Sequence, residues 1–85
     1  MLGCTVVVTI QNKPEISDPE GTSILNNLVL RYGNMNVSSI RTAKTLKFTI
    51  DSDSDNIEDR VRQMCDDLHI YNPLISTITV KKEIQ

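Results

Sequence analysis

Residues 45–68 read TLKFTIDSDSDNIEDRVRQMCDDL, and this stretch contains two hydrophobic patterns in succession. Its first six residues alternate polar and apolar side chains, a period of two that predicts a strand with one buried face. Apolar residues then recur every three or four positions from Ile57 to Leu68, which predicts an amphipathic helix. Asp55 and Glu58 have the spacing of a capping box in front of that helix. A strand and a helix in close succession predict an α+β domain.

The rest of the chain supplies further elements of the same two kinds. Residues 5–10 are a β-branched run that predicts a strand, and Asp18 followed by Pro19 predicts the start of a helix. Gly33 and Asn34 predict a left-handed end to this helix. The expected elements are strands at residues 5–10, 37–42, 45–50 and 75–80 and helices at residues 19–32 and 57–69.

In this order the elements predict one ferredoxin-like domain over residues 1–85, with two helices on one face of an antiparallel four-stranded sheet. The two middle strands are expected to form a hairpin that turns around Ala43 and Lys44. The other face of the sheet would be bare, and a bare β-branched face suits packing against another sheet in a dimer. From the alternation of side chains along each strand, that face should carry Thr5, Val7, Thr9, Thr45, Lys47, Thr49, Ile75, Thr77 and Thr79.

Composition and charge narrow the class of protein. The 85 residues have a formal net charge of -2, from 9 basic and 11 acidic residues, and no basic stripe typical of nucleic-acid binding. No stretch has the length of a membrane-spanning helix, and the N-terminus has no signal-peptide pattern. We therefore expect a cytosolic protein without nucleic-acid or membrane partners. A chain this short buries only a thin core, which favours at least a dimer.

Motifs for catalysis and cofactor binding are missing from the sequence. The chain has 3 glycines, and none belongs to a phosphate-binding or dinucleotide-binding pattern. The single histidine, His69, falls in the last turn of the second helix, where capping is favoured over acid-base chemistry. Cys4 and Cys65 are in phase with core positions, and we interpret both as buried apolar side chains. We expect no catalytic residue, metal or cofactor on this chain.

Three stretches, in this order and spacing, resemble the PurS subunit of phosphoribosylformylglycinamidine synthase. The likeness spans nearly the whole chain. The chain departs from the family at Ala43, where glycine is usual, and at Ile70 and Tyr71, where a leucine-alanine pair is usual. The matching stretches are Asp18-Pro19-Glu20-Gly21 at the first helix, residues 37–50 with Arg41 and Lys44 at the hairpin, and Met64-Cys65 followed by Leu68 and Asn72-Pro73.

The resemblance implies a small, dimeric accessory subunit without catalytic residues of its own. In this family the subunit joins a PurL-type synthetase subunit, which uses ATP and magnesium, to a PurQ-type glutaminase subunit, which releases ammonia, during purine biosynthesis. The resemblance also implies contacts with partner subunits at the non-core positions that carry it, which are Asp18, Gly21, Arg41, Lys44, Asn72 and Pro73. The residues themselves favour helix capping over partner contact for Asp18, and partner contact for Arg41 and Lys44.

Two other interpretations remain open. A free-standing ligand-sensing module similar to the ACT class has the same order of elements. Such modules commonly use a glycine-rich turn after the first strand, and residues 13–18 contain no glycine. A homodimeric structural domain is the third interpretation, and no residue pattern excludes it.

Overall fold

An antiparallel sheet of three strands organises the molecule, whose computed structural model describes residues 3–33, 36–51 and 55–83. The sheet order is β2-β1-β3, so the β-branched first strand lies in the middle. These elements confirm an α+β fold with an antiparallel sheet and two helical regions. The strands are β1 (Cys4–Asn12), β2 (Ala43–Ile50) and β3 (Ser76–Lys82), and the helical segments are α1 (Pro19–Ile24), the π-helical turn η1 (Leu25–Val29), α2 (Leu30–Tyr32) and α3 (Ile57–Asp67).

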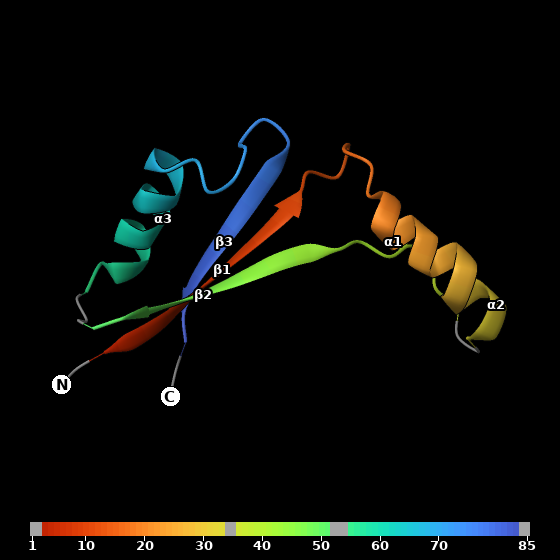
Figure 1. The fold of residues 1–85 in the computed structure, drawn as a ribbon, viewed down its shortest axis with the longest axis horizontal. Helices are drawn as coiled ribbons and strands as arrows, with labels where there is room; N and C mark the ends of the chain where they lie inside the picture. Colours follow the sequence, from red (N-terminus) through yellow and green to blue (C-terminus); the bar gives the residue numbers. More distant parts are fainter. Residues whose placement is uncertain (1–2, 34–35, 52–54, 84–85) are drawn as a thin grey trace.

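The hydrophobic core lies between α3 and one face of the sheet. Val6 and Val8 of β1 and Cys65 of α3 are fully buried there. The registers place Phe48 beside Val6 and both Leu46 and Val80 beside Val8, which confirms the predicted inward phase. Helix α3 packs on β3 and β1, as Figure 1 shows. Strand β2 stands to the side of α3, and its inward residues are therefore only half-buried.

The outer face of the sheet follows the predicted alternation. Val7 lies between Lys47 and Lys81, and threonines occupy most neighbouring positions. Ile75 is an exception, because β3 begins one residue later at Ser76. The outer face is thus bare and β-branched, as expected.

The first helical region does not cover the sheet. Segments α1, η1 and α2 follow one another as a continuous rod that points away from the strands and packs on none of them (Figure 1). The chain measures 50 × 30 × 14 Å, and its radius of gyration is 16.5 Å. A compact chain of this length has a radius of gyration of about 12 Å. The expectation that both helices lie on one face of the sheet is therefore not met within the single chain.

The predicted fourth strand, residues 37–42, is absent from the sheet that the described residues form. The chain from residue 36 to 42 returns along the helical rod and continues directly into β2, with no hairpin turn at Ala43 or Lys44. Those two residues instead pair with Gln11 and Ile10 of β1. We call residues 19–33 and 36–42 together the arm.

The ends of the helices differ in detail from the sequence pattern. Helix α3 is preceded by Asn56 as its N-cap, one residue after the predicted Asp55. With Asn56 as the N-cap, Asp55 and Glu58 do not form the predicted capping box. The Glu58 carboxylate instead accepts a hydrogen bond of 2.7 Å from the backbone N–H of Lys82 and so joins α3 to β3. Gly33 has a φ of -77°, so the predicted left-handed exit does not occur there. Asn34, the other half of that prediction, lies outside the described residues.

His69 carries the left-handed conformation that ends α3, with a φ of 54°. The backbone N–H of Ile70 bonds to the Cys65 carbonyl at 3.0 Å, which is the outer hydrogen bond of a Schellman-type ending. The sequence placed His69 inside the last turn, whereas α3 ends at Asp67. His69 therefore ends α3 through its backbone conformation, which glycine adopts at a lower cost in free energy.

Replacing His69 with glycine is expected to raise the free energy of unfolding by about 0.5 to 1 kcal/mol. Relief of the left-handed strain outweighs the greater freedom that glycine gives the unfolded chain. Urea denaturation followed by circular dichroism measures the change. Asp59→Gly, at an exposed helical position of α3, is the control and should lower stability. A loss of stability in His69→Gly would contradict the argument.

Candidate functional site

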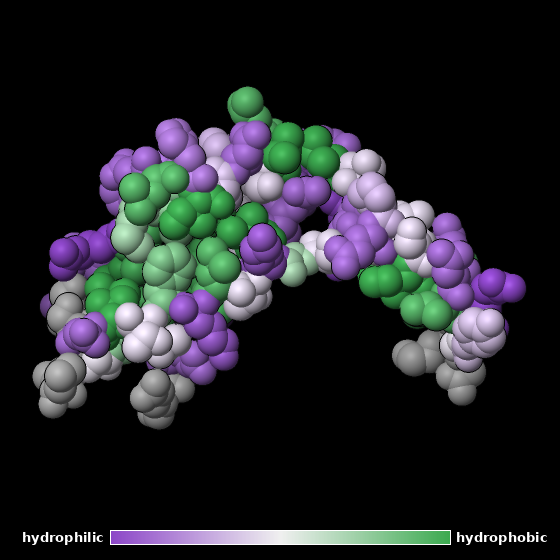
Figure 2. Space-filling view, viewed as in Figure 1, coloured by the Kyte–Doolittle hydropathy of each residue, from purple (hydrophilic) through white to green (hydrophobic). Residues whose placement is uncertain are grey.

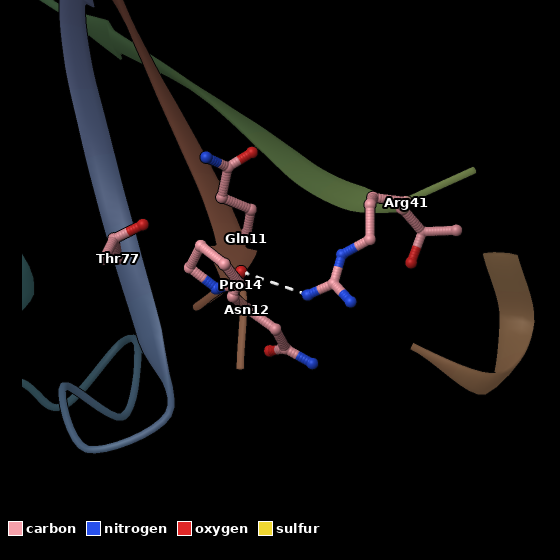
Figure 3. A pocket seen from close by; sticks show the side chains of 6 residues that line it. Gln11, Asn12, Pro14, Arg41 and Thr77 are labelled. Atoms are coloured by element: carbon pink, nitrogen blue, oxygen red, sulfur yellow. Dashed lines mark hydrogen bonds between the residues drawn. The ribbon is translucent and has the colours of Figure 1, made fainter. Parts of the chain in front are cut away.

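The arm leaves the body of the protein at the end of β1, and a pocket lies at this junction. Its volume is about 290 Å³. Figure 3 shows the lining side chains, which come from β1 and the loop after it, from β3 and from the segment that precedes β2. We call it the hinge pocket, and it is lined by Gln11, Asn12, Pro14, Arg41, Thr42 and Thr77.

Arg41 spans the hinge pocket from the arm to the body. Its guanidinium donates a hydrogen bond to the backbone carbonyl of Lys13 at 3.0 Å. It donates a second one to the carbonyl of Asn12 at 3.5 Å, which Figure 3 shows as a dashed line. A guanidinium has five donors, so two carbonyl contacts leave others for a partner. The side chain is exposed. Arg41 is therefore both a brace of the hinge and a cation available at the surface.

Asp18 holds the base of the arm together. It is buried, with 7% of its surface exposed. Its carboxylate accepts hydrogen bonds from the Gly21 N–H at 3.1 Å, from the Thr42 N–H and from the Thr42 hydroxyl at 2.9 Å. The backbone N–H donors of Thr42 and Gly21 lower the pKa of Asp18 below its usual 3.8. The predicted capping role of Asp18 is thus confirmed, and the bond to Thr42 adds a link across 24 residues that the sequence did not indicate.

Gly21 is the point where the two halves of the arm approach most closely. A β-carbon at this position would overlap the carbonyl oxygen of Ile40 and lie 2.8 Å from its carbonyl carbon. Only glycine lets the first turn of the helix lie against residues 40–41. Gly21 is buried, so its place in the fold is internal packing.

Asn72 and Pro73 lie in the loop between α3 and β3, which meets the chain just after β1. The Asn72 side chain accepts a bond from the Leu74 N–H at 3.0 Å, an Asx turn that reverses the chain. Ile75 in the same loop accepts a bond from the Lys13 N–H at 2.8 Å. Both Asn72 and Pro73 are exposed. The loop and the hinge pocket therefore border the same end of the sheet.

Lys44 is the second residue of β2 and is exposed. It lies on the α3 side of the sheet, across from Ile10. It lines a second, shallow hollow of about 600 Å³ together with Glu20 of α1 and Ile70. The six residues singled out by sequence thus lie around the junction of the arm with the sheet. Asn12, Thr42 and Thr77, which the sequence analysis missed, complete this junction, and no local pattern distinguishes them from ordinary strand residues.

The two cysteine thiols and the Tyr71 hydroxyl are the reactive side chains considered next. Cys4 and Cys65 are both buried and form no disulfide, as the sequence predicted. Burial raises the pKa of the Cys65 thiol, and the neighbouring Asp66 charge adds to the effect, so the thiolate is disfavoured. Tyr71 donates a bond of 2.6 Å to Asp66, and this bond raises the pKa of its hydroxyl. Within residues 3–33, 36–51 and 55–83, no cluster of three His, Cys, Asp or Glu side chains is arranged to hold a metal.

The described residues thus form a three-stranded sheet with one packed helix and a helical arm that packs on no strand, joined by a hinge that Arg41 and Asp18 brace. The family of the chain follows from comparison with known proteins. The sequence profile of the PurS family, described as phosphoribosylformylglycinamidine (FGAM) synthase, matches residues 5–84. The chain therefore belongs to the PurS family, and it is an accessory subunit of FGAM synthase in purine biosynthesis. No curated protein sequence matches it significantly.

Solved structures share the fold along almost the whole chain. PurS of Methanocaldococcus jannaschii, described as one of the subunits of formylglycinamide ribonucleotide amidotransferase, is 28% identical with a TM-score of 0.80, over 96% of this chain and 99% of that one. PurS of B. subtilis is 24% identical with a TM-score of 0.73, over 95% and 99% of the two chains. A chain in the structure of PurLQS from Thermotoga maritima is 17% identical with a TM-score of 0.81, over 98% and 100%.

In the part of the chain that the structure describes, no helix is both long and apolar enough to cross a membrane.

Proposed function

We propose that this chain is the subunit that joins the synthetase and glutaminase subunits of FGAM synthase in the cytoplasm, without catalytic residues of its own. The observation that carries the proposal is the unpacked arm, on which Leu28, Leu30 and Tyr32 are 56%, 57% and 76% exposed. Large apolar side chains at such exposure are typical of a surface that another protein covers. Membership of the PurS family, and the likeness to a chain in the PurLQS structure, support the synthetase and glutaminase subunits as the partners that cover it.

The same proposal includes a homodimer. A helix of this length is only marginally stable in water by itself, so a partner must stabilise the rod. The predicted four-stranded ferredoxin-like unit belongs, in this view, to the assembled protein and not to the isolated chain.

The surface around the hinge is the proposed contact surface for the larger subunits. Arg41 and Lys44 bring two cations to it, and the exposed loop at Asn72 and Pro73 borders it. Asp18 and Gly21 shape it from inside, since both are buried. No cofactor is assigned to this chain, and ATP and magnesium are used by the synthetase subunit.

Reconstitution with purified synthetase and glutaminase subunits tests the proposal. Adding this chain should produce one co-eluting complex in size-exclusion chromatography and should switch on FGAM formation with glutamine as the nitrogen donor. FGAM formation with free ammonia serves as the control, because it needs only the synthetase. A chain that elutes alone and leaves the glutamine reaction unchanged would overturn the proposal. Binding of a free amino acid in calorimetry would then favour the ACT-like alternative.

Replacing Lys44 with glutamate is expected to weaken binding to the larger subunits about tenfold, the effect of losing a contact of about 1.4 kcal/mol. The thermal midpoint should stay unchanged, because the side chain is exposed. Biolayer interferometry against the immobilised synthetase measures the affinity. Lys81→Glu, which makes the same charge change on the outer sheet face, is the control and should bind normally. Equal losses in both variants would point to net charge alone.

A further inference from the structure

The hinge pocket brings together parts of the chain that are distant in sequence. Gln11 and Thr77 are directly opposite each other in the β1–β3 register, so their side chains stand next to each other on the outer face of the sheet. Arg41 enters from the arm, and Figure 3 shows it reaching toward the end of β1. A molecule in this pocket would therefore touch the body and the arm at once.

The polar side chains of the hinge pocket have hydrogen-bonding capacity to spare. Both bonds of Arg41 to backbone carbonyls use Nη2, and among the described residues Nε and Nη1 have no partner. The bond to Asn12 is 3.5 Å long, close to the limit for a hydrogen bond, so an acceptor in the pocket can displace it. The Gln11 amide and the Thr77 hydroxyl also have no hydrogen-bond partner in the part of the chain that the structure describes. The pocket thus combines one cation with two neutral groups that both donate and accept.

The charge of the hinge pocket selects a class of ligand. Among the described residues, its lining has one cation, Arg41, and no Asp or Glu. The Asp18 carboxylate lies near Arg41 but accepts bonds from the N–H groups of Gly21 and Thr42 and is not part of the lining. A guanidinium has a planar edge of two N–H groups that matches a carboxylate. A ligand ammonium, by contrast, would have no anion to pair with.

The size and the remaining lining of the pocket limit the uncharged part of the ligand. A volume of about 290 Å³ equals that of about ten water molecules at about 30 Å³ each, which suits a compact organic acid. The ring of Pro14 offers an apolar surface to a short aliphatic chain. Figure 2 shows hydrophilic residues along the junction between the body and the arm, and hydrophobic residues gathered on the body and on the rod. The junction therefore favours a polar ligand.

We infer that the hinge pocket binds a small monocarboxylate that has an amide or hydroxyl group at its other end and no ammonium group. The carboxylate accepts hydrogen bonds from Nε and Nη2 of Arg41. The neutral end of the ligand bonds to the Gln11 amide and the Thr77 hydroxyl. This inference does not rest on the proposed subunit role.

Ligand binding and the position of the arm are linked through Arg41. The side chain already joins the arm to the body by its bond to the Lys13 carbonyl. A bound acid adds a second connection, from Arg41 to the side chains of β1 and β3. A ligand that prefers one position of the arm shifts the arm toward that position. The acid should therefore slow the amide hydrogen exchange of residues 36–42, which connect the rod to β2.

Titration of the full-length chain with succinamate tests the inference. Succinamate has a carboxylate at one end, a short aliphatic chain and an amide at the other end. Calorimetry should give a dissociation constant of about 0.1 to 1 mM, as expected for a ligand of this size. Two matched compounds are the controls, and each should bind at least about tenfold more weakly. Succinamide replaces the carboxylate with a neutral amide, and L-asparagine adds an ammonium group to succinamate.

Variants of exposed lining residues place the ligand in the hinge pocket. Thr77→Val removes only the hydroxyl and should weaken succinamate binding about fivefold, the effect of one hydrogen bond. Thr79→Val makes the same change at the next outer-face position of β3, outside the pocket lining, and should bind normally. Gln11→Glu puts a competing carboxylate into the pocket and should weaken binding more than about tenfold, whereas Thr79→Glu, with the same change in charge, should not.

Arg41→Lys keeps the positive charge but loses the planar pair of donors, and should weaken binding about tenfold. Because Arg41 also braces the hinge, the variants of Thr77 and Gln11 decide the question if Arg41→Lys disturbs the fold.

Each outcome of the titrations supports or overturns the inference. Equal binding of succinamate and succinamide would show that Arg41 does not receive a carboxylate. Tighter binding of inorganic phosphate would assign the pocket to another class of anion. Tighter binding of L-asparagine would assign it to amino acids and would favour the ACT-like alternative. If succinamate gives no signal up to about 10 mM, far above the expected constant, the site is disproved. The subunit role would then still stand, because reconstitution decides it separately.

Discussion

Replacing Gly21 with alanine is expected to lower the free energy of unfolding by about 3 kcal/mol, the cost of severe overpacking against rigid backbone. The added β-carbon would lie 2.8 Å from the Ile40 carbonyl carbon and overlap its oxygen, so the two halves of the arm must separate. The sign is informative. In an exposed helix, glycine to alanine stabilises by about 0.5 to 1 kcal/mol. Destabilisation here therefore isolates the close contact from helix propensity.

Thermal and urea denaturation measure this effect. The matched control is Ser23→Ala, two positions along the same helix at an exposed site, which should be neutral or slightly stabilising. We also expect Gly21→Ala to reduce dimer formation, because the arm loses its shape. A stabilised Gly21→Ala protein would show that the helix and residues 40–41 do not lie together in solution.

Replacing Asp18 with asparagine is also expected to lower the free energy of unfolding strongly. It should in addition make that free energy depend less on pH. Asparagine retains one acceptor for capping, but its amide group would face the backbone N–H of Thr42 donor to donor. In the folded chain the pKa of Asp18 is lowered below 3.8. A lowered folded pKa means that the ionised carboxylate stabilises the fold fully above the unfolded value, and that this stabilisation is lost as pH falls through the folded value.

Urea midpoints measured between about pH 2 and pH 7 test the pH effect, since that window spans the reference carboxyl pKa values. The wild-type chain should lose stability below pH 4, and Asp18→Asn should lose less over the same range while being less stable at pH 7. Glu20→Gln removes an exposed carboxylate from the same helical turn and is the control. Parallel curves for the wild type and Asp18→Asn would mean that the buried carboxylate is not the group that titrates.

The elements of the body could be predicted from sequence because their patterns are local. The alternation in residues 45–50 and the apolar stripe of α3 each identify one buried face, and the observed registers agree. The start of the first helix was equally clear, since Asp18 caps it and Pro19 occupies its first turn. Each of these signals depends on neighbours within one or two turns of chain.

The position of the arm could not be predicted in the same way. The apolar spacing of residues 24–32 is identical whether the helix covers its own sheet or another surface. Residues 37–42 have β-branched side chains but mixed alternation, and they gave the one strand that the described sheet lacks. The difference is decided by contacts distant in sequence, chiefly Asp18 with Thr42 and Gly21 with Ile40. Such contacts have no periodic signature.

The candidate site shows the same division. Partner contact was favoured for Arg41 and Lys44 because neither has an obvious capping duty, and Arg41 also braces the hinge through two backbone carbonyls. Asn12, Thr42 and Thr77 reach the hinge pocket only because three segments meet there. A single sequence records the residues of a pocket but not which segments fold together to form it.

The helical rod has one more consequence. The helical rod is stabilised mainly by the surface that packs on it. The exchange rate of its backbone amide hydrogens with solvent therefore depends on whether that surface is bound. In a free chain these amides should exchange far faster than those of β1, whose two neighbours are both in place. When the rod is covered, the two rates should converge. Deuterium uptake along residues 22–32 would then measure the fraction of the protein that is unbound in a mixture of free and bound chains.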